Sequence, residues 1–277
     1  MARLYALLRC PTCDSGLQQG AGRCGGCGRR LQTATGVLDL LRDDVRSDAD
    51  HFAERYRALR VQEGWATPTG QEDPDRAEGK RWGRRVQAVK TAAAVLEHVL
   101  SQGARPVVGD VGAGGGWAAR YFPWADVIAF DLLDAPAAPG PALRVRADMR
   151  QLPLRDGAID GLLYTAAIHH VPVDDAIREA ARVLRPEGLL VAIESPMYVD
   201  RRAAERAAQR SAEYYSDSGY PELARHYHPV DVRQLRTALA NAGFLVERLE
   251  MPSAWLTLWR RLPGRHAFPR LVARLNR

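Results

Sequence analysis

The stretch GDVGAGGGW, residues 109–117, holds five glycines in nine residues. The apolar run in residues 106–111 predicts a buried strand, and the residues after the glycines predict a helix that begins near Trp117. Glycine has no side chain to bury and loses more freedom on ordering than other residues. A glycine-rich turn between a strand and a helix therefore indicates that a ligand comes close to the backbone here.

The spacing of these glycines narrows the choice of ligand. Gly112, Gly114 and Gly116 form G-x-G-x-G, whereas the dinucleotide fingerprint is G-x-G-x-x-G and would need a glycine at Trp117. An acid, Asp110, stands just before the first glycine of the motif. The spacing thus disfavours a nicotinamide dinucleotide and favours another adenosine ligand.

Strands and helices alternate along the rest of the central region. Further strands are expected to end at Asp131 and at Asp148 and to span residues 159–164, and a helix and a fifth strand follow in residues 173–196. An acid at the tip of a second strand can accept hydrogen bonds from both ribose hydroxyls. The alternation predicts an α/β protein with a doubly wound, mostly parallel, Rossmann-like sheet.

In this order, the motifs resemble the class I S-adenosylmethionine (SAM) dependent methyltransferases, of the methyltransferase type 11-like kind, over residues 80–250. The resemblance implies an enzyme, a methyltransferase, that uses SAM. It implies that Asp110 and residues 112–116 receive the methionine part, Asp131 the ribose, and Asp148 with Met149 the adenine. The cofactor-binding residues that we expect are Asp110, Gly112, Ala113, Gly114, Gly116, Asp131, Leu132, Asp148 and Met149. One departure is the short, proline-containing segment between Asp131 and Asp148, which argues against a full helix there.

All four cysteines lie near the start of the sequence. They form CPTC and CGGC, spaced C-x2-C-x10-C-x2-C, at Cys10, Cys13, Cys24 and Cys27. Four thiolates in two such pairs suit a closed, tetrahedral, structural zinc site. Two disulfides or a redox pair are the alternatives, which the absence of a secretory signal and the doubled motif disfavour. Short strands are expected on either side, in residues 4–10 and 31–41.

Charge is unevenly distributed. The formal net charge is +6, but the six arginines after residue 250 meet no acid, so residues 1–250 balance. A globally basic nucleic-acid binder is therefore not indicated. In the tail, Trp255, Trp259 and Leu262 share a helical face, which predicts a contact with a membrane surface, RNA or a second copy, or a last element of the core. We expect a zinc ribbon in residues 1–42, a helical linker and cofactor cover in 43–79, and the SAM-dependent methyltransferase domain in 80–277 with a basic amphipathic tail, 251–277.

The methyl acceptor is constrained mainly by exclusion. No cysteine lies outside the ribbon, and the fourth strand ends in YTAAIHH, not in the Asn/Asp-Pro-Pro-Tyr/Phe motif of adenine amino methyltransferases. Oxygen, nitrogen or activated carbon acceptors remain. His169 and His170 are the candidate catalytic bases, because histidine can accept a proton near neutral pH, or they shape the cofactor pocket. Residues 226–228, His-Tyr-His, fall in the insertion that usually covers the substrate.

Three functions stay open. The first is a methyltransferase acting on a small-molecule or lipid-like acceptor. The second is an rRNA or tRNA base methyltransferase that docks RNA through its ribbon, because a ribbon before a SAM domain is similar in layout to bacterial large-subunit rRNA guanine methyltransferases. Those enzymes generally use a histidine where this chain has Cys27, and the basic residues that would meet phosphate are Arg9, Arg23, Arg29 and Arg30. The third is a non-catalytic SAM-fold protein that binds a partner. With no apolar run long enough to span a bilayer and no signal peptide, the expected location is cytoplasmic.

Overall fold

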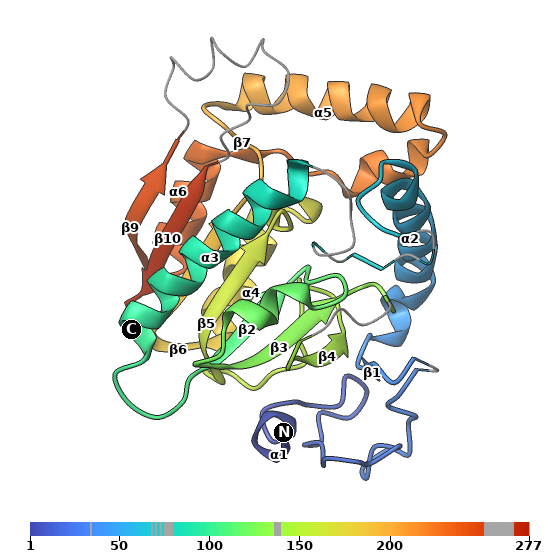
Figure 1. Cartoon of the computed structure of the whole chain (residues 1–277), viewed down its shortest axis with the longest axis vertical. Coiled ribbons are helices and arrows are strands. Elements are labelled where there is room, and N and C mark those ends of the chain that lie inside the picture. Colours follow the sequence, from blue (N-terminus) through green and yellow to red (C-terminus); the bar gives the residue numbers. More distant parts are fainter. Residues whose placement is uncertain are drawn as a thin grey trace.

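The computed structural model describes residues 1–33, 35–67, 69, 71, 72, 74, 80–135, 140–251 and 269–276. Its principal strands are β1 (Leu38–Asp39), β2 (Val107–Val111), β3 (Asp126–Asp131), β4 (Leu143–Arg146), β5 (Ile159–Thr165), β6 (Leu184–Ile193), β9 (Phe244–Glu250) and β10 (Arg270–Leu275). Within the described residues these eight form one sheet in the order β1-β4-β3-β2-β5-β6-β10-β9 (Figure 1). The six strands from β1 to β6 run parallel, and β10 is antiparallel to both neighbours. The mostly parallel α/β sheet predicted from the sequence is confirmed.

The described helices are α1 (Ala2–Tyr5), α2 (Asp43–Gln62), α3 (Lys80–Leu100), α4 (Val173–Val183), α5 (Arg201–Asp217) and α6 (Val232–Asn241), with the 3-10 helices η1 (Trp117–Tyr121), η2 (Ile168–His170) and η3 (Pro221–His226). Three helices, α3, α4 and α6, form layers on the two faces of the sheet. α3 shares a buried cluster with Val108 and Leu163 on one face, and α4 and α6 share another with Val107 and Leu162 on the other. Because both faces are covered, β2 is buried at every residue, as its apolar sequence requires.

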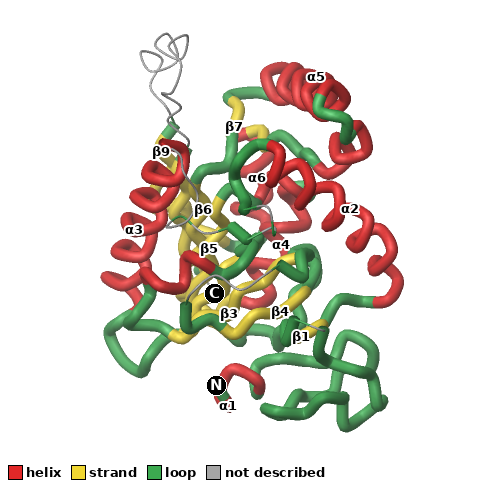
Figure 2. Tube along the Cα trace, turned by 45° about the vertical axis from the view of Figure 1, so that its right-hand side comes forward, coloured by secondary structure: helices red, strands yellow, loops and turns green. Residues whose placement is uncertain are grey.

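Two helices lie beyond the carboxyl ends of the strands instead of on a face. α5 lies across one end of the molecule and α2 along the side next to β4 and β1, in both views (Figures 1 and 2). Apolar residues of α2, α5 and η3 form one small cluster with Phe52, Tyr215 and Leu223 at its centre. The strand β7 (Met197–Tyr198) precedes α5, and β8 (Val230–Asp231) follows η3. Their parallel pairing brings the two ends of this segment together. These elements enclose the space above the sheet edge.

The first 42 residues pack directly on the sheet. β1 pairs with β4, and Leu8 forms an isolated bridge with Leu154. Leu4, Leu8 and Leu31 are buried in the same cluster as the sheet residues. The strand expected over residues 4–10 is wrong in its first half, where the short helix α1 forms and buries Leu4. Leu8 lies beyond this helix and is buried at its bridge with Leu154. These N-terminal residues and the sheet therefore share one core.

One further expectation is corrected, and another lies largely outside the described residues. The helix expected from Trp117 is only the short 3-10 helix η1, which ends at Tyr121. The side chains of Trp117, at its start, and Phe122, just after its end, are both buried in the core. In the predicted tail, residues 252–268, including Trp255, Trp259 and Leu262, lie outside the described residues. The tail's last part is β10, an inner strand between β6 and β9 and part of the core. Among the described residues, no helix has the length and apolarity needed to cross a bilayer.

Candidate functional site

A cavity of about 570 Å³ lies across the carboxyl ends of the central strands. Its floor comes from residues at or just after the ends of β2 to β6, such as Val111, Asp131, Asp148, Thr165 and Glu194. Ligands of doubly wound sheets bind at this edge, and cavities of this size hold small-molecule ligands and cofactors. Other walls come from α2, η2 and η3, from Tyr215 of α5, and from Glu72, Arg85, Asp175 and His228.

The glycine loop forms one side of the cavity. Gly112, Gly114 and Gly116 all have positive φ, at 73°, 56° and 81°, which favours glycine. A Cβ on Gly112 would lie 2.4 Å from the Cβ of Ala167, and one on Gly114 would lie 2.8 Å from Oε2 of Glu72. A side chain at Gly112 or Gly114 would therefore collide with the protein's own atoms, as well as with the ligand expected from the sequence.

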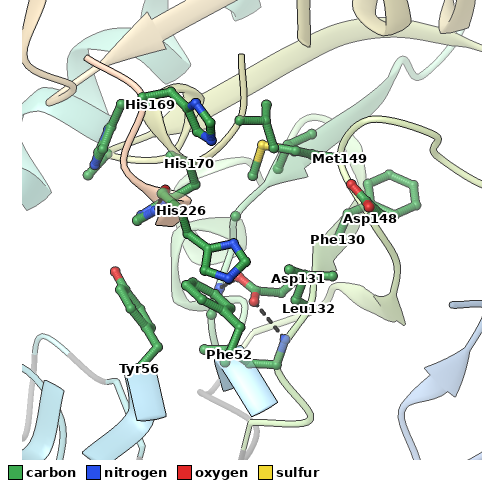
Figure 3. Close-up of a pocket in the computed structure, with 18 of the residues that line it drawn as sticks. Phe52, Tyr56, Phe130, Asp131, Leu132, Asp148, Met149, His169, His170 and His226 are labelled. Carbon is green, nitrogen blue, oxygen red and sulfur yellow. Dashed lines mark hydrogen bonds between the residues drawn. The ribbon is translucent and has the colours of Figure 1, made fainter. Parts of the chain in front are cut away.

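Asp131 ties this loop to β3. Its Oδ2 accepts a hydrogen bond from the backbone N–H of Gly114 at 2.7 Å, and its Oδ1 accepts one from Leu133 at 2.8 Å (Figure 3). Burial raises the pKa of Asp131, and these two backbone hydrogen bonds act in the opposite direction. Asp131 and Leu132 both line the cavity. The carboxylate still has lone pairs for a ligand's hydroxyl groups.

Asp148 and Met149 line the same end of the cavity (Figure 3). Asp148 is buried, and both of its oxygens accept from Nε of Arg150, at 3.0 and 2.9 Å. The backbone N–H of Arg150 also donates to Oδ1 at 2.8 Å. An amine that approached Asp148 would therefore have to share the carboxylate with Arg150.

Three of the nine predicted cofactor contacts do not line the cavity: Asp110, Ala113 and Gly116. Asp110 is buried behind the loop, and its Oδ1 has no hydrogen-bond partner among the described residues. Burial, together with the nearby charge of Asp131, raises the pKa of Asp110 to about 7. The structure thus places Asp110 in an apolar site that favours its neutral form, and its direct contact with a cofactor stays a prediction.

The two candidate bases are placed in the cavity by η2. Nδ1 of His169 lies 3.2 Å from Oγ of Ser195, and Nδ1 of His170 lies 3.3 Å from the backbone oxygen of His226. The two imidazole centroids are 4.4 Å apart. Burial lowers the pKa of His169 well below its usual value and that of His170 to about 4. Both rings are therefore neutral at physiological pH, able to accept a proton but weak as bases.

A group of rings faces these histidines. The Phe52 and Tyr56 rings of α2 stack at 5.1 Å, the Tyr56 ring meets His170 edge-on at 5.4 Å, and the Phe52 ring lies 4.5 Å from that of His226 (Figure 3). His226 and His228 line the cavity, as their position in the insertion indicates. Of the tyrosines at 214 and 215, Tyr215 is buried and lines it.

Several charged residues of the cavity were not identified from the sequence. Arg60, Glu72 and Arg85 are three of them, and the others are Asp48, Arg150, Asp175, Glu194 and Arg225. The guanidinium of Arg60 lies 4.7 Å from the Tyr56 ring centroid, and that of Arg85 lies 4.2 Å from the Trp65 centroid. Burial raises the pKa of Glu72 and lowers that of Arg85. Arg60 lies on α2, Arg85 lies on α3, and Glu72 lies beside Gly114 of the glycine loop. Their approach to one another depends on long-range packing, for which the sequence carries no motif.

The four cysteines form a separate centre. Their sulfurs lie within 4.8 Å of one another, with Cys10 to Cys27 at 3.7 Å and Cys13 to Cys24 at 3.5 Å. All four thiols are free, and these distances are far longer than a disulfide bond. Side-chain and backbone hydrogen bonds with Ser15 lower the pKa of Cys13 to about 6, toward the thiolate. No described residue before Val45 lines the cavity, so this centre is not part of it.

Comparisons with known proteins agree with this geometry. A model of the methyltransferase domain family matches residues 109–192, which include the glycine loop and both histidines of η2. No curated protein matches the sequence.

Solved structures share the fold at low sequence identity. Geranyl diphosphate C-methyltransferase from Streptomyces coelicolor, solved with Mg²⁺, geranyl diphosphate and S-adenosylhomocysteine, is 16% identical with a TM-score of 0.54, covering 82% of this chain and 97% of its own. A candidate sarcosine dimethylglycine methyltransferase from Galdieria sulphuraria is 15% identical with a TM-score of 0.52, covering 83% and 98%. A candidate methyltransferase from Bacillus halodurans is 19% identical with a TM-score of 0.50, covering 68% and 100%. The chain therefore has the Rossmann-like methyltransferase fold, and residues 109–192 match a methyltransferase domain.

Proposed function

We propose that this protein is a SAM-dependent methyltransferase that methylates an oxygen, nitrogen or activated carbon of a small-molecule or lipid-like acceptor. The observation that carries the proposal is that the glycine loop and Asp131 line the same cavity as the histidines of η2. The family match to residues 109–192 and the shared fold support the reaction class. The acceptor class rests on the size of the cavity, about 570 Å³, and on the aromatic side chains that line it.

The residues at one end of the cavity fit SAM. The loop backbone, the Asp131 carboxylate and the Asp148–Met149 pair would hold its methionine part, ribose and adenine, as the resemblance implies. Glu72 and Arg85 add one acid and one base beside the loop, a charge pair that suits the ammonium and carboxylate of an amino acid. When bound, SAM supplies an activated methyl group on a sulfonium. The protein then has to hold an acceptor in line with that methyl group and keep water out.

The other end fits the acceptor. Phe52, Tyr56 and Tyr215 offer flat apolar walls, and the neutral His169 and His170 can take the proton that a hydroxyl or amine loses as its new bond to carbon forms. Because the pKa of His170 is about 4, proton transfer to it suits an acceptor that is itself readily deprotonated. Orientation of the acceptor, more than strong base catalysis, is the contribution we assign to this end.

The RNA alternative has weaker support from the ribbon. Arg29 is largely buried at an ion pair with Asp43, and Arg9 pairs with Asp14, so two of the four arginines expected to meet phosphate have partners within the chain. The ribbon contributes its leucines to the core and no residue to the cavity. A non-catalytic role is disfavoured by the charged and polar groups that line the cavity.

We also propose that the four cysteines hold one zinc ion. Zinc–sulfur bonds of about 2.3 Å in a tetrahedron place sulfurs about 3.8 Å apart, close to the 3.5 and 3.7 Å separations in this chain. With four protein ligands the ion would have no open position, so its role would be structural.

The test uses SAM carrying a labelled methyl group, incubated with the full-length protein and an extract from cells that lack the gene. We expect label in the organic-extractable fraction and none in RNA. Asp131→Ala should abolish the transfer and weaken SAM binding in calorimetry, whereas Asp217→Ala, an exposed acid on α5, should change neither. Label in RNA would favour the RNA alternative, and unchanged SAM affinity in Asp131→Ala would overturn the cofactor assignment.

A further inference from the structure

One buried arginine connects the cysteine centre to the helix that covers the cavity. Arg29 follows Cys27 by two residues, and its side chain is only 13% exposed. Its Nη1 donates to Oγ1 of Thr12 at 2.9 Å and lies 3.1 Å from Oδ1 of Asp43, and its Nη2 donates to the backbone oxygen of Leu41 at 2.5 Å. One side chain thus contacts the first cysteine loop, the connecting segment and the first turn of α2.

The backbone of Arg29 belongs to the second cysteine loop. Its carbonyl oxygen accepts from the N–H of Cys24 at 2.8 Å, and the N–H of Gly28 donates to the oxygen of Cys24 at 2.9 Å. Thr12 stands between Cys10 and Cys13. The position of the guanidinium is therefore set by both cysteine pairs, which a bound metal would fix relative to each other.

The start of α2 depends on contacts of this kind. Its N-cap residue, Arg42, makes no side-chain capping hydrogen bond. Instead, Arg29 reaches Asp43 in the first turn, and Arg46 pairs with Asp39 at 2.8 Å and donates to Leu41 O at 3.0 Å. A helix end without a cap frays unless outside groups hold it. The later turns have other supports, such as the Arg55–Glu222 pair at 2.9 Å.

α2 carries one whole wall of the cavity. The cavity-lining residues of this helix recur every three or four positions, and so share one face: Val45, Asp48, Ala49, Phe52, Tyr56 and Arg60. Three of them, at positions 45, 48 and 49, lie within the first two turns, beside the contacts of Arg29. A change at the cysteine centre would therefore reach the cavity through this helix.

We propose that Arg29 is a positioning residue that couples the metal-loaded cysteine centre to α2 and so holds the cavity wall closed. Loss of the metal, or of the Arg29 contacts, would release the first turns of α2 and loosen ligand binding, although no cysteine touches a ligand. The consequence for SAM and its acceptor rests on the proposed function. The coupling between the centre and the helix does not.

Hydrogen exchange of the full chain without SAM, with metal content measured in parallel, tests the coupling. In Arg29→Ala we expect amides of residues 43–53 to exchange about tenfold faster, with β2 and β3 unchanged and the metal retained. Arg29→Lys should restore part of the protection. Arg30→Ala, an exposed neighbour, is the matched control and should match the wild type.

A second variant approaches from the helix side. Asp43→Asn removes the partner of Arg29 without altering the ribbon and should speed exchange in the same residues about threefold. Asp44→Asn also removes a first-turn acid, but one that pairs with Arg42, and should have a smaller effect. If Arg29→Ala does not fold, Arg29→Lys and Asp43→Asn decide the question.

Removal of the metal from the wild type by a chelator should accelerate exchange in residues 43–53 as well. The proposal is overturned if α2 exchanges alike in Arg29→Ala and Arg30→Ala, or, where the alanine variant is unfolded, alike in Asp43→Asn and Asp44→Asn. Faster exchange in the ribbon alone after chelation would also overturn it. A protein that shows the coupling but binds no SAM would contradict the proposed function and leave the coupling standing.

Discussion

The two ends of the cavity are built from different parts of the chain. Burial raises the pKa values of the acids at one end and lowers those of the histidines at the other. One end consists of the glycine loop and the tips of β3 and β4. The pKa values of Asp131, which lines it, and of Asp110, which is buried behind the loop, are raised. The other consists of α2, η2 and η3, and its histidines, His169 and His170, have lowered pKa values. In both cases burial favours the neutral form of these groups. A cationic ligand such as a sulfonium would favour ionised carboxylates at the first end.

The glycine loop offers the largest expected effect. Gly112→Ala would force a side chain into positive φ and within 2.4 Å of the Ala167 Cβ, so the loop must shift away from Asp131. We expect SAM affinity to fall by about a hundredfold or more, about 3 kcal/mol, in calorimetry. Gly103→Ala, where a Cβ would meet nothing within 4 Å, is the control and should bind normally. Normal binding by Gly112→Ala would show that the loop is not the cofactor end.

The raised pKa of Asp110 can be tested through the pH dependence of the free energy of unfolding. Its folded pKa of about 7 lies above the ordinary value of about 3.9, so the folded state retains a proton that the unfolded state has lost. This lowers the free energy of unfolding as pH rises from about 4 through 7. Asp110→Asn removes that penalty, and its gain over the wild type in urea unfolding should be roughly 2 to 3 kcal/mol larger at pH 8 than at pH 5. An equal difference at both pH values would contradict the raised pKa.

The lowered pKa of His170 predicts a pH dependence of the free energy of unfolding with the opposite sign. Its folded pKa of about 4 lies below the ordinary value of about 6.5, so the unfolded state binds the proton first as pH falls. The free energy of unfolding should therefore be fully present above pH 6.5 and decline toward pH 4, by about 2 kcal/mol between pH 7 and pH 5. His170→Gln should remove this part of the slope. His51→Gln, an exposed histidine on α2, should leave the slope unchanged.

The difference between the two ends also marks what sequence reasoning could predict. The cofactor end is local: the strand, the glycines and the acids at strand tips follow from spacing within short segments, and β2, β3, β5 and β6 lie where they were expected. The acceptor end and the side chains that reach the glycine loop from outside it are assembled by long-range packing, so Arg60, Glu72 and Arg85 carried no signal. β10 was missed for the same reason, because its six residues are recognisable as a strand only once β6 and β9 flank them. The role of β1 as an extra edge strand likewise depends on how the ribbon docks on β4.

Of these substitutions, those at Asp148 should have the smallest effect on SAM affinity. Its carboxylate is already engaged by Arg150, through Nε at 3.0 and 2.9 Å and through the backbone N–H at 2.8 Å. A ligand amine would therefore replace part of an existing interaction, and the net gain from a shared, charge-assisted hydrogen bond is about 1 kcal/mol. Asp148→Asn should weaken SAM binding only about fivefold in calorimetry. Arg150→Gln, which frees the carboxylate, should tighten it slightly. A loss in Asp148→Asn as large as in Gly112→Ala would instead mean that Asp148 is a principal cofactor contact and that Arg150 moves aside on binding.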